Sequence, residues 1–362
     1  MRMNKPKILY VVPTLKKDGA EVQISNLVSN LTKFQIDIYT FDLYRRGDSI
    51  ESSLDAINIY SKNGIFNIFQ LNKLININNY EVVHSHLPKA DFLVGILKFF
   101  KRSFIHLISV HAQYGTRNKE SKIKYAVFNI IWKYILNHSD GVIAISNKIS
   151  NWLIEERNIN SNLITTIHYG VKIRQRDKKL PNKKTVGMAA RMVPWKGWDK
   201  VIDTAVLLKE QNVDFNLILA GSDDINYKNT LVDLVNKKGI KSFVSFHDHY
   251  EEIDDFFSQI DLFLFLSDSE GFGLVVLEAI ENDIPVICSN IAPLSEFVDN
   301  THGTLIDPQD ITKVANLAKN ILLNEDFRTE VQKKQKEKII ADFSIITASS
   351  NYENYYIKLL ND

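Results

Sequence analysis

Two glutamates in the stretch 267–279, SDSEGFGLVVLEA, predict chemistry through their type and their spacing. Glu270 stands directly before a pair of glycines, and Glu278 lies within an apolar run that has the pattern of a buried helix. A carboxylate that is buried without a partner destabilises a protein, so retention of both glutamates without a function is the weaker explanation. Ionised carboxylates accept hydrogen bonds from hydroxyl groups. The pair therefore predicts a site for a ligand that is rich in hydroxyl groups.

The two glycines, Gly271 and Gly273, predict that this ligand also carries a phosphate. They follow the strand-like run DLFLFLS and stand where the next helix is expected to begin. Glycine lets a ligand approach the backbone, and the unpaired N–H groups and the dipole of a helix start favour an anion. From Gly273 to Glu278 the helix rises about 7 to 8 Å, so the two glutamates bracket the anion site. A sugar nucleotide, with a sugar and a ribose on either side of a pyrophosphate, has this layout.

A second loop supplies positive charge. The stretch 187–203, GMAARMVPWKGWDKVID, leaves a strand-like run and places Arg191 and Lys196 ahead of the next helix. An arginine and a lysine can together neutralise a pyrophosphate without a metal ion, although both could also be solvated surface cations. Near the start of the chain, PTLKKDGAE places Gly19 at a similar strand-to-helix junction. The GxGxxG fingerprint of dinucleotide binding does not occur there, so that type of site is not predicted.

Histidines raise the alternative of a metal site. His84 and His86 alternate near the end of one strand-like run, and His111 ends the next run. No carboxylate or thiolate completes this set at ligand spacing, so we expect His111 to line a pocket instead. His247 and His249 form a similar pair, for which exposed loop positions are the expected environment.

The acidic SDSE stretch provides a second metal hypothesis. Asp268 and Glu270 stand at alternate positions, from which two carboxylates could bind a divalent cation that holds a diphosphate. Arg191 and Lys196 already provide positive charge for the diphosphate, which makes such a cation redundant. We therefore expect no cofactor and no metal ion, and the nucleotide sugar enters as a substrate.

The elements that must position these residues follow from the hydrophobic pattern. Short β-rich apolar runs alternate with helical patterns, as in KILYVV, AEVQISNLVSNLTKF and QIDIYTF, which predicts a parallel sheet wrapped by helices. The alternation stops at residues 173–184, a basic stretch with few apolar residues that is typical of a linker, and then resumes. We therefore predict two Rossmann-like α/β domains, residues 1–172 and 185–346, and a final helix, residues 347–362, that packs back on the first.

Length and composition agree with two domains and exclude several classes of protein. A chain of 362 residues exceeds the size at which a single core usually stops growing, and 45% hydrophobic and 24% charged residues are typical of globular proteins. The net charge of +1 argues against nucleic acid as a partner. The single cysteine, Cys288, excludes an intrachain disulfide and favours a reducing compartment. Because the first apolar run is too short for a signal peptide, we expect a cytoplasmic protein.

Contact with the inner face of the cell membrane is a further hypothesis. No stretch reaches the roughly 18 apolar residues that a membrane-spanning helix needs. However, LKFFKR at residues 97–102 and KYAVFNIIWKYIL at residues 124–136 combine apolar and basic side chains, as surface-bound segments do. The alternative, a core helix with solvated lysines, is slightly favoured.

The chain resembles the retaining glycosyltransferases of the large GT4 family, which have the two-domain GT-B fold. The resemblance covers essentially the whole length and is most specific between residues 187 and 308, where AARMVPWKG, LILAGS, EGFGLVVLEAIENDIPVICSN and GTLIDP follow one another in the family's order. Two positions depart from the family pattern, which has glycine where Asp18 and Asp248 stand here. These departures affect loop geometry and recognition of the nucleobase.

The resemblance implies a role for each candidate residue. Glu270 and Glu278 match the first and second glutamates of the E-x7-E motif, which contact the transferred sugar and the ribose. Arg191 and Lys196 match the cations on the diphosphate, and His111 matches the histidine at the reaction centre. The remaining residues implied in donor binding are Gly19, Gly271, Phe272, Gly273 and Leu274.

The activity that the resemblance implies is transfer of a hexosyl or N-acetylhexosaminyl group with retained anomeric configuration. The donor is a nucleotide diphosphate sugar, and the acceptor is a hydroxyl group of a glycan or a lipid-linked molecule in cell-surface polysaccharide biosynthesis. Two alternatives stay open: a sugar-nucleotide 2-epimerase with the GT-B fold, and a non-catalytic subunit of another transferase. The joint presence of Glu270, Glu278, Arg191 and Lys196 favours a catalyst.

Overall fold

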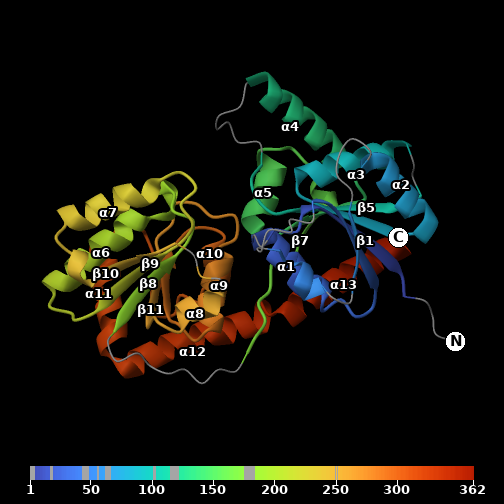
Figure 1. Ribbon diagram of the computed structural model, residues 1–362. Coiled ribbons are helices and arrows are strands. Elements are labelled where there is room, and N and C mark those ends of the chain that lie inside the picture. Colours follow the sequence, from blue (N-terminus) through green and yellow to red (C-terminus); the bar gives the residue numbers. More distant parts are fainter. Residues whose placement is uncertain are drawn as a thin grey trace. The chain divides into compact units, whose positions relative to one another are not determined.

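The structure is a computed structural model of the chain (Figure 1), and its secondary structure follows the predicted alternation of strands and helices. It describes residues 5–16, 19–42, 49–54, 57–61, 67–100, 103–114, 122–174, 184–248, 250 and 252–362. Asp18, His249 and most of the predicted linker 173–184 lie outside the described residues.

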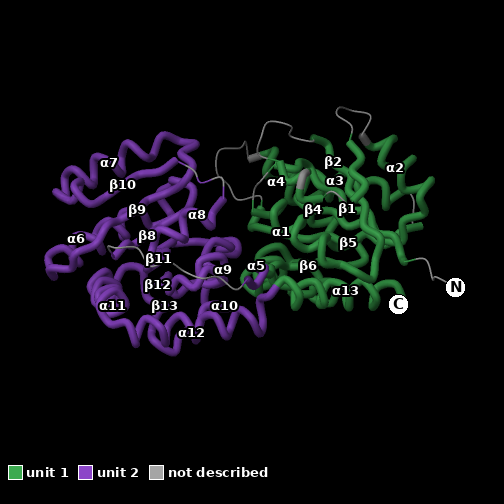
Figure 2. Tube along the Cα trace, turned by 60° about the horizontal axis from the view of Figure 1, so that its bottom comes forward, with its two compact units in different colours: residues 1–170, 345–362 green, residues 171–344 purple. Residues whose placement is uncertain are grey.

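The chain divides into two compact units (Figure 2). Unit 1 comprises residues 1–170 and 345–362, and unit 2 comprises residues 171–344. The chain therefore passes from one unit to the other twice. Its last helix, α13 (Ile345–Asn361), belongs to the unit in which the chain begins.

Unit 1 is built on a parallel sheet with strand order β3-β2-β1-β4-β5-β6-β7. The chain starts in the middle of this sheet, builds outwards on one side, and then crosses back to build the other side. The order therefore reverses between the neighbours β1 and β4, and ligands of such sheets bind beyond the carboxyl ends of the strands at this point. The strands are β1 (Lys7–Thr14), β2 (Gln35–Asp42), β3 (Asn58–Ser61), β4 (Val82–His86), β5 (Ile105–Val110), β6 (Gly141–Ala144) and β7 (Ile164–Thr166).

Helices cover both faces of this sheet because each central strand is apolar on both sides. In β1, Ile8 and Tyr10 point to a cluster that includes side chains of α1 and α13, and Leu9 and Val11 point to a cluster with α2 and α3. The helical elements of unit 1 besides α13 are α1 (Gly19–Val28), η1 (Glu51–Leu54), α2 (Asn67–Asn78), α3 (Pro88–Phe100), α4 (Lys122–Asn137), α5 (Asn147–Glu155) and η2 (Ser161–Leu163).

Unit 2 repeats this plan with a parallel sheet of order β10-β9-β8-β11-β12-β13, which reverses between β8 and β11. Its strands are β8 (Thr185–Ala189), β9 (Asn216–Ala220), β10 (Val244–His247), β11 (Leu262–Phe265), β12 (Val286–Ser289) and β13 (Leu305–Ile306). Its helical elements are η3 (Pro194–Lys196), α6 (Trp198–Glu210), α7 (Tyr227–Lys237), η4 (Lys241–Phe243), α8 (Ile253–Phe257), α9 (Leu274–Glu281), α10 (Leu294–Phe297), α11 (Ile311–Leu323) and α12 (Glu325–Asp342).

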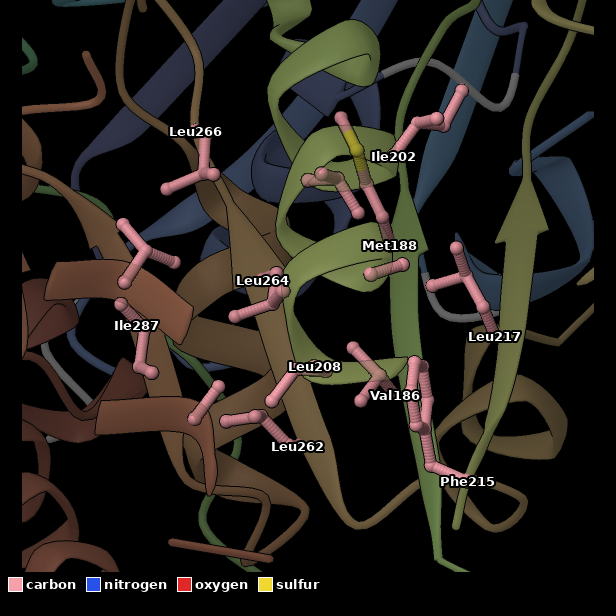
Figure 3. Close-up of a cluster of buried hydrophobic side chains, with 14 of the residues drawn as sticks. Val186, Met188, Ile202, Leu208, Phe215, Leu217, Leu262, Leu264, Leu266 and Ile287 are labelled. Carbon is pink, nitrogen blue, oxygen red and sulfur yellow. The ribbon is translucent and has the colours of Figure 1, made fainter. Parts of the chain in front are cut away.

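The core of unit 2 fixes the strands that lead to the candidate site. Val186 of β8 and Leu264 of β11 are buried in one apolar cluster with Ile202 of α6 (Figure 3). Burial of side chains of this size is worth about 1.5 to 3 kcal/mol each, so the register of β8 and β11 is strongly specified. The loops that leave these two strands therefore start from well-defined positions.

Both parallel α/β folds expected from the sequence pattern are confirmed by this architecture. Among the helices that the structure describes, none has the length and apolar character that crossing a bilayer requires.

Candidate active site

The candidate site of unit 2 lies where its strand order reverses. The loop after β8 carries Arg191 and Lys196, and the loop after β11 carries Glu270. Because β8 and β11 are parallel neighbours, these loops leave the same edge of the sheet side by side. This is the edge at which ligands of doubly wound sheets bind.

Lys196 and Glu270, which the sequence predicted separately, are bonded to each other. Lys196 Nζ lies 2.5 Å from Glu270 Oε1, and the two side chains are only 14% and 7% exposed. The lysine ammonium also lies 5.5 Å from the ring centroid of Phe265, at the end of β11. In a buried ion pair of this kind each partner offsets the other's loss of hydration.

Further bonds join the two loops. The amide of Asp268 donates to the carbonyl of Trp195 at 2.8 Å, and the hydroxyl of Ser267 donates to the same carbonyl at 3.1 Å. Lys200, which is 9% exposed, forms a second ion pair with Asp268. Each carboxylate of the SDSE stretch therefore has a lysine beside it, which supplies the positive charge that a divalent cation would otherwise bring. Within the described ranges, no group of three or more histidine, cysteine or acidic side chains is arranged to hold a metal ion.

Gly197 explains how Lys196 comes so close to β11. Its φ of 79° is left-handed, and a Cβ atom there would lie 2.0 Å from the carbonyl oxygen of Leu266. Only glycine allows this contact without a shift of the backbone. The glycine ends η3 and begins α6, so it fixes the position from which the lysine extends.

Helix α9 begins where the sequence predicted. Gly273 has a left-handed φ of 92° and stands directly before Leu274, the first residue of the helix. A Cβ atom at Gly273 would lie 2.4 Å from Leu294 Cδ2, so a side chain would also displace a packed neighbour. Phe272 points into the core, where its ring stacks on Phe297 with the centroids 5.2 Å apart. If Phe272 contacts a ligand, it therefore does so through its backbone.

Glu278 lies one and a half turns along α9 and is half-buried. Burial raises the pKa of its carboxyl to about 7, the nearby Asp254 and Glu281 raise it too, and Arg174 opposes them. At neutral pH this carboxyl is therefore protonated more often than that of an exposed glutamate. Hydroxyl groups that donate to a carboxylate stabilise its ionised form, so a bound ribose would lower this pKa.

Arg191 lies on the exposed side of the same edge. Its backbone carbonyl accepts a hydrogen bond from Trp198 Nε1 at 3.2 Å, and the next amide, of Met192, donates to Ser222 at 2.8 Å. The backbone of this loop is thus held while the guanidinium reaches solvent. Asp248, one of the two departures from the family pattern, is exposed and paired with Lys228.

The other two predicted residues belong to unit 1. Gly19 is the first residue of α1, and a Cβ atom there would meet nothing within 4 Å. His111 follows β5 and is 8% exposed. Its Nε2 lies 3.0 Å from His86 Nδ1, and its Nδ1 is bonded to the hydroxyl of Tyr169. Burial lowers the pKa of His111 to about 3, so the imidazole is neutral.

The structure thus brings Arg191, Lys196, Glu270, Gly271 and Gly273 to one edge of unit 2, with Glu278 on the adjoining helix. Sequence reasoning missed Lys200 as the partner of Asp268. The sequence did contain a signal for this pair. Lys200 stands four residues after Lys196, and Asp268 and Glu270 form a matching pair of acidic residues at alternate positions. It also missed the bond between His86 and His111, for which the linear sequence has no signal.

Two family models match the chain. The model described as glycosyl transferases group 1 matches residues 171–338, and the model described as glycosyltransferase family 4 matches residues 17–175. The two matches together extend over most of both units.

Individual proteins match over nearly the whole chain. The O-antigen biosynthesis glycosyltransferase WclY of Escherichia coli is 28% identical, over 98% of this chain and 99% of its own length. The capsular polysaccharide biosynthesis glycosyltransferase CapM of Staphylococcus aureus is 22% identical, over 97% and 90%. Among solved structures, Anabaena HepE in complex with UDP and glucose superposes with a TM-score of 0.81 at 19% identity, covering 98% of this chain and all of that one. The predicted GT-B fold is confirmed by this similarity.

Proposed function

We propose, on the premise that this chain belongs to the GT4 glycosyltransferases, that it moves a hexosyl or N-acetylhexosaminyl group from a nucleotide diphosphate sugar to a hydroxyl group with retained configuration. The acceptor we propose is a glycan or a lipid-linked molecule of a cell-surface polysaccharide. The relatives named for O-antigen and capsular polysaccharide biosynthesis support this assignment.

The observation that carries the proposal is the buried ion pair between Lys196 and Glu270 beside the start of α9. A diphosphate that enters this edge competes with the carboxylate for the lysine. Lys196 then binds the diphosphate, and Glu270 is released towards the sugar. The pair therefore holds both side chains in place until a ligand arrives that is anionic at one end and rich in hydroxyl groups at the other.

The chemistry follows from this charge distribution. The bond between the anomeric carbon and the phosphate oxygen breaks, and the carbon gains positive charge. The acceptor oxygen bonds to the same face of that carbon, and its proton passes to the departing phosphate. Arg191, Lys196 and the start of α9 stabilise the charge that develops on the phosphate, and removal of one such group typically costs about 3 kcal/mol. Glu270 stabilises the carbon side.

A screen of nucleotide sugars by thermal shift tests the proposed function. A donor present at 100 times its dissociation constant should stabilise the protein by about 2.7 kcal/mol. Product analysis with that donor alone then separates the alternatives, because an epimerised sugar identifies the 2-epimerase. If no nucleotide sugar stabilises the protein and none is consumed with a membrane extract as the acceptor source, the proposal is wrong.

We also propose contact with the inner face of the cell membrane through α3 and α4. Their exposed apolar side chains include Phe100 at 80%, Ile123 at 77% and Ile130 at 69%, with lysines interspersed. Such a surface fits anionic lipids. Ile130→Glu should reduce sedimentation with anionic vesicles at low salt, whereas Ile77→Glu on α2, at 65% exposure, is the matched control. Equal recovery of the parent protein with and without vesicles would contradict this docking.

A further inference from the structure

The carboxyl ends of β4 and β5 hold a cluster of buried histidines that the proposed function uses only in part. His84, His86 and His111 are each less than one-tenth exposed. The two ring nitrogens of His84 are bonded to Tyr356 and Ser109, at 2.7 and 2.8 Å. Both ring nitrogens of His111 are also bonded within unit 1. His86 differs: its Nδ1 is bonded to His111, but its Nε2 has no hydrogen-bond partner among the described residues.

The His86 ring lines a small pocket within unit 1. The volume of the pocket is about 10 Å³, which is room for one water-sized group. Polar side chains in its wall include Gln23, His111 and Tyr169, and most of its other lining is apolar and comes from α1 and α13. His86 thus combines a place in the wall of this pocket with a ring nitrogen, Nε2, that has no partner among the described residues. Buried polar atoms without a partner are rare in native proteins, so this nitrogen calls for a ligand.

Burial sets the protonation state of the chain of bonds that ends at this nitrogen. It lowers the pKa of His111 to about 3 and the pKa of His86 well below its ordinary value, and it raises the pKa of the Tyr169 hydroxyl. At neutral pH each imidazole is therefore uncharged, with one nitrogen that donates and one that accepts.

The chain from Tyr169 through His111 to His86 can then run in two directions. If the tyrosine hydroxyl donates to His111 Nδ1, each later bond points the same way and His86 Nε2 carries a hydrogen. If the tyrosine oxygen accepts, every bond is reversed and His86 Nε2 is an acceptor. A hydroxyl group matches both cases because it donates and accepts, whereas an anion or a cation matches only one.

We propose that His86 Nε2 binds a hydroxyl group of the sugar substrate, and that His111 and Tyr169 are positioning residues that fix the His86 tautomer. The inference rests on the proposed function. It assigns the substrate contact to His86 rather than to His111, because the latter has both nitrogens bonded within the protein. The hydroxyl group comes from the transferred sugar or from the acceptor, and the experiment below separates these sources.

Two amide variants dissect the two nitrogens of His86. The Asn side chain in His86→Asn reaches the position of Nδ1 only, so it can keep the bond to His111 while it loses the pocket contact. The Gln side chain in His86→Gln reaches the position of Nε2, so it keeps a polar group at the pocket. We expect His86→Asn to lower kcat/KM by about 10- to 100-fold and His86→Gln to lower it less.

Calorimetry with the donor found by the thermal-shift screen and with its nucleotide diphosphate identifies the source of the hydroxyl group. Weaker binding of the nucleotide sugar to His86→Asn, with unchanged binding of the nucleotide diphosphate, assigns the contact to the transferred sugar. Unchanged binding of both, with a raised KM for the acceptor, assigns it to the acceptor. If His86→Asn matches the parent in binding and in kinetics, the pocket holds a resident water and the inference is wrong. If the parent itself binds no nucleotide, the proposed function has failed instead.

The positioning role has its own readout. In ¹⁵N-histidine NMR spectra of the ligand-free protein, Tyr169→Phe should change the nitrogen shifts of His86 as well as those of His111, because the tautomers are linked. Tyr60→Phe, a partly buried tyrosine on β3, serves as the control. Unchanged His86 shifts in Tyr169→Phe would overturn the linkage.

Discussion

The two units have sheets of the same strand order, apart from the additional strand β7 of unit 1, but the edges at which these sheets reverse hold opposite kinds of side chain. In unit 2 the edge holds charges, in the pairs between Lys196 and Glu270 and between Lys200 and Asp268. In unit 1 the corresponding edge holds uncharged rings, with His86 bonded to His111. One topology therefore presents two different chemistries, and the side chains at the strand ends decide which.

The difference has a physical cause. Lys196 and Glu270 form an ion pair in a poorly hydrated place, where each offsets the other's loss of hydration. The rings of His84, His86 and His111 are bonded to hydroxyl groups and to each other and not to a carboxylate, and burial lowers the pKa of all three, so they are neutral. A charged edge suits a diphosphate, and a neutral edge suits hydroxyl groups. The comparison predicts that the two edges respond differently to substitution, pH and chelators.

The largest expected effect is that of Lys196→Met. It removes the main cation proposed at the diphosphate and leaves Glu270 buried without its lysine. We therefore expect kcat/KM to fall by a factor equivalent to about 3 to 4 kcal/mol of activation free energy. Lys238→Met, which breaks a surface pair with Asp203, is the matched control and should change kcat/KM by less than about 0.5 kcal/mol. Steady-state kinetics checks both. Equal effects of the two substitutions would remove the distinction between the charged edge and an ordinary surface.

The next effect divides the two glutamates. In the proposed function Glu270 faces a sugar that gains positive charge, so Glu270→Gln should lower kcat/KM by a factor equivalent to about 2 to 4 kcal/mol, chiefly in kcat. Glu278 is proposed to face a ribose that changes little during reaction, so Glu278→Gln should mainly raise KM and weaken binding of the nucleotide diphosphate. Kinetics and calorimetry together measure this division. The opposite result, with nucleotide affinity lost in Glu270→Gln and kept in Glu278→Gln, would reverse the assignment of the two ends.

A smaller effect concerns acid stability, which should depend on the buried neutral histidine His106 in β5 of unit 1. Burial lowers the pKa of His106 to about 3, below that of the unfolded chain, so the unfolded state takes up the proton first as pH falls. The contribution of His106 to the free energy of unfolding is complete above about pH 6.5. It decreases as the pH falls further, by about 2 kcal/mol at pH 5. His106→Asn should therefore show a smaller loss of unfolding free energy between pH 7 and pH 5, measured by urea titration.

Asp91 acts in the opposite direction and serves as the control. Burial raises the pKa of its carboxyl to about 7, so the folded state takes up this proton first and gains stability as pH falls from 7 towards 4. Asp91→Asn should therefore increase the loss of unfolding free energy between pH 7 and pH 5, whereas His106→Asn should reduce it. Parallel pH profiles for the parent and both variants would contradict burial of His106 in its neutral form.

The smallest expected effect is none at all: EDTA should leave the rate of transfer unchanged. In the proposed function Arg191 and Lys196 supply the positive charge at the diphosphate, and a lysine is paired with each carboxylate of the SDSE stretch. The measurement is activity after dialysis against EDTA, with buffer dialysis as the control. Loss of activity that magnesium or manganese restores would mean that Asp268 and Glu270 bind a cation after all.

The fold and one part of the site follow from the sequence for local reasons. The apolar runs of β1 and β8, each followed by a helical pattern, predict parallel strands, and the glycine at position 273 predicts the start of α9. Each of these predictions depends on only a few neighbouring residues. Lys196 and Glu270 could each be predicted as ligand-binding, yet their bond to each other could not. They are 74 residues apart, and the register of β8 against β11 brings them together.

The unit 1 edge was harder to predict for the same reason. The two ring nitrogens of His111 are bonded to His86 and Tyr169, which are 25 and 58 residues away in the sequence. The strand pattern places His84 and His86 at a strand end, but it does not indicate which nitrogen finds a partner. That depends on packing of α1 and α13 over the sheet, which a single sequence does not specify.

The most direct test of the contrast between the two edges is calorimetric titration of the nucleotide diphosphate into the parent, Lys196→Met and His86→Asn. The nucleotide diphosphate carries the charge of the donor but not its transferred sugar. We expect Lys196→Met to weaken its binding by about tenfold or more and His86→Asn to leave its binding unchanged. Binding that is weakened in His86→Asn and kept in Lys196→Met would contradict the assignment of charge to unit 2 and of hydroxyl groups to unit 1.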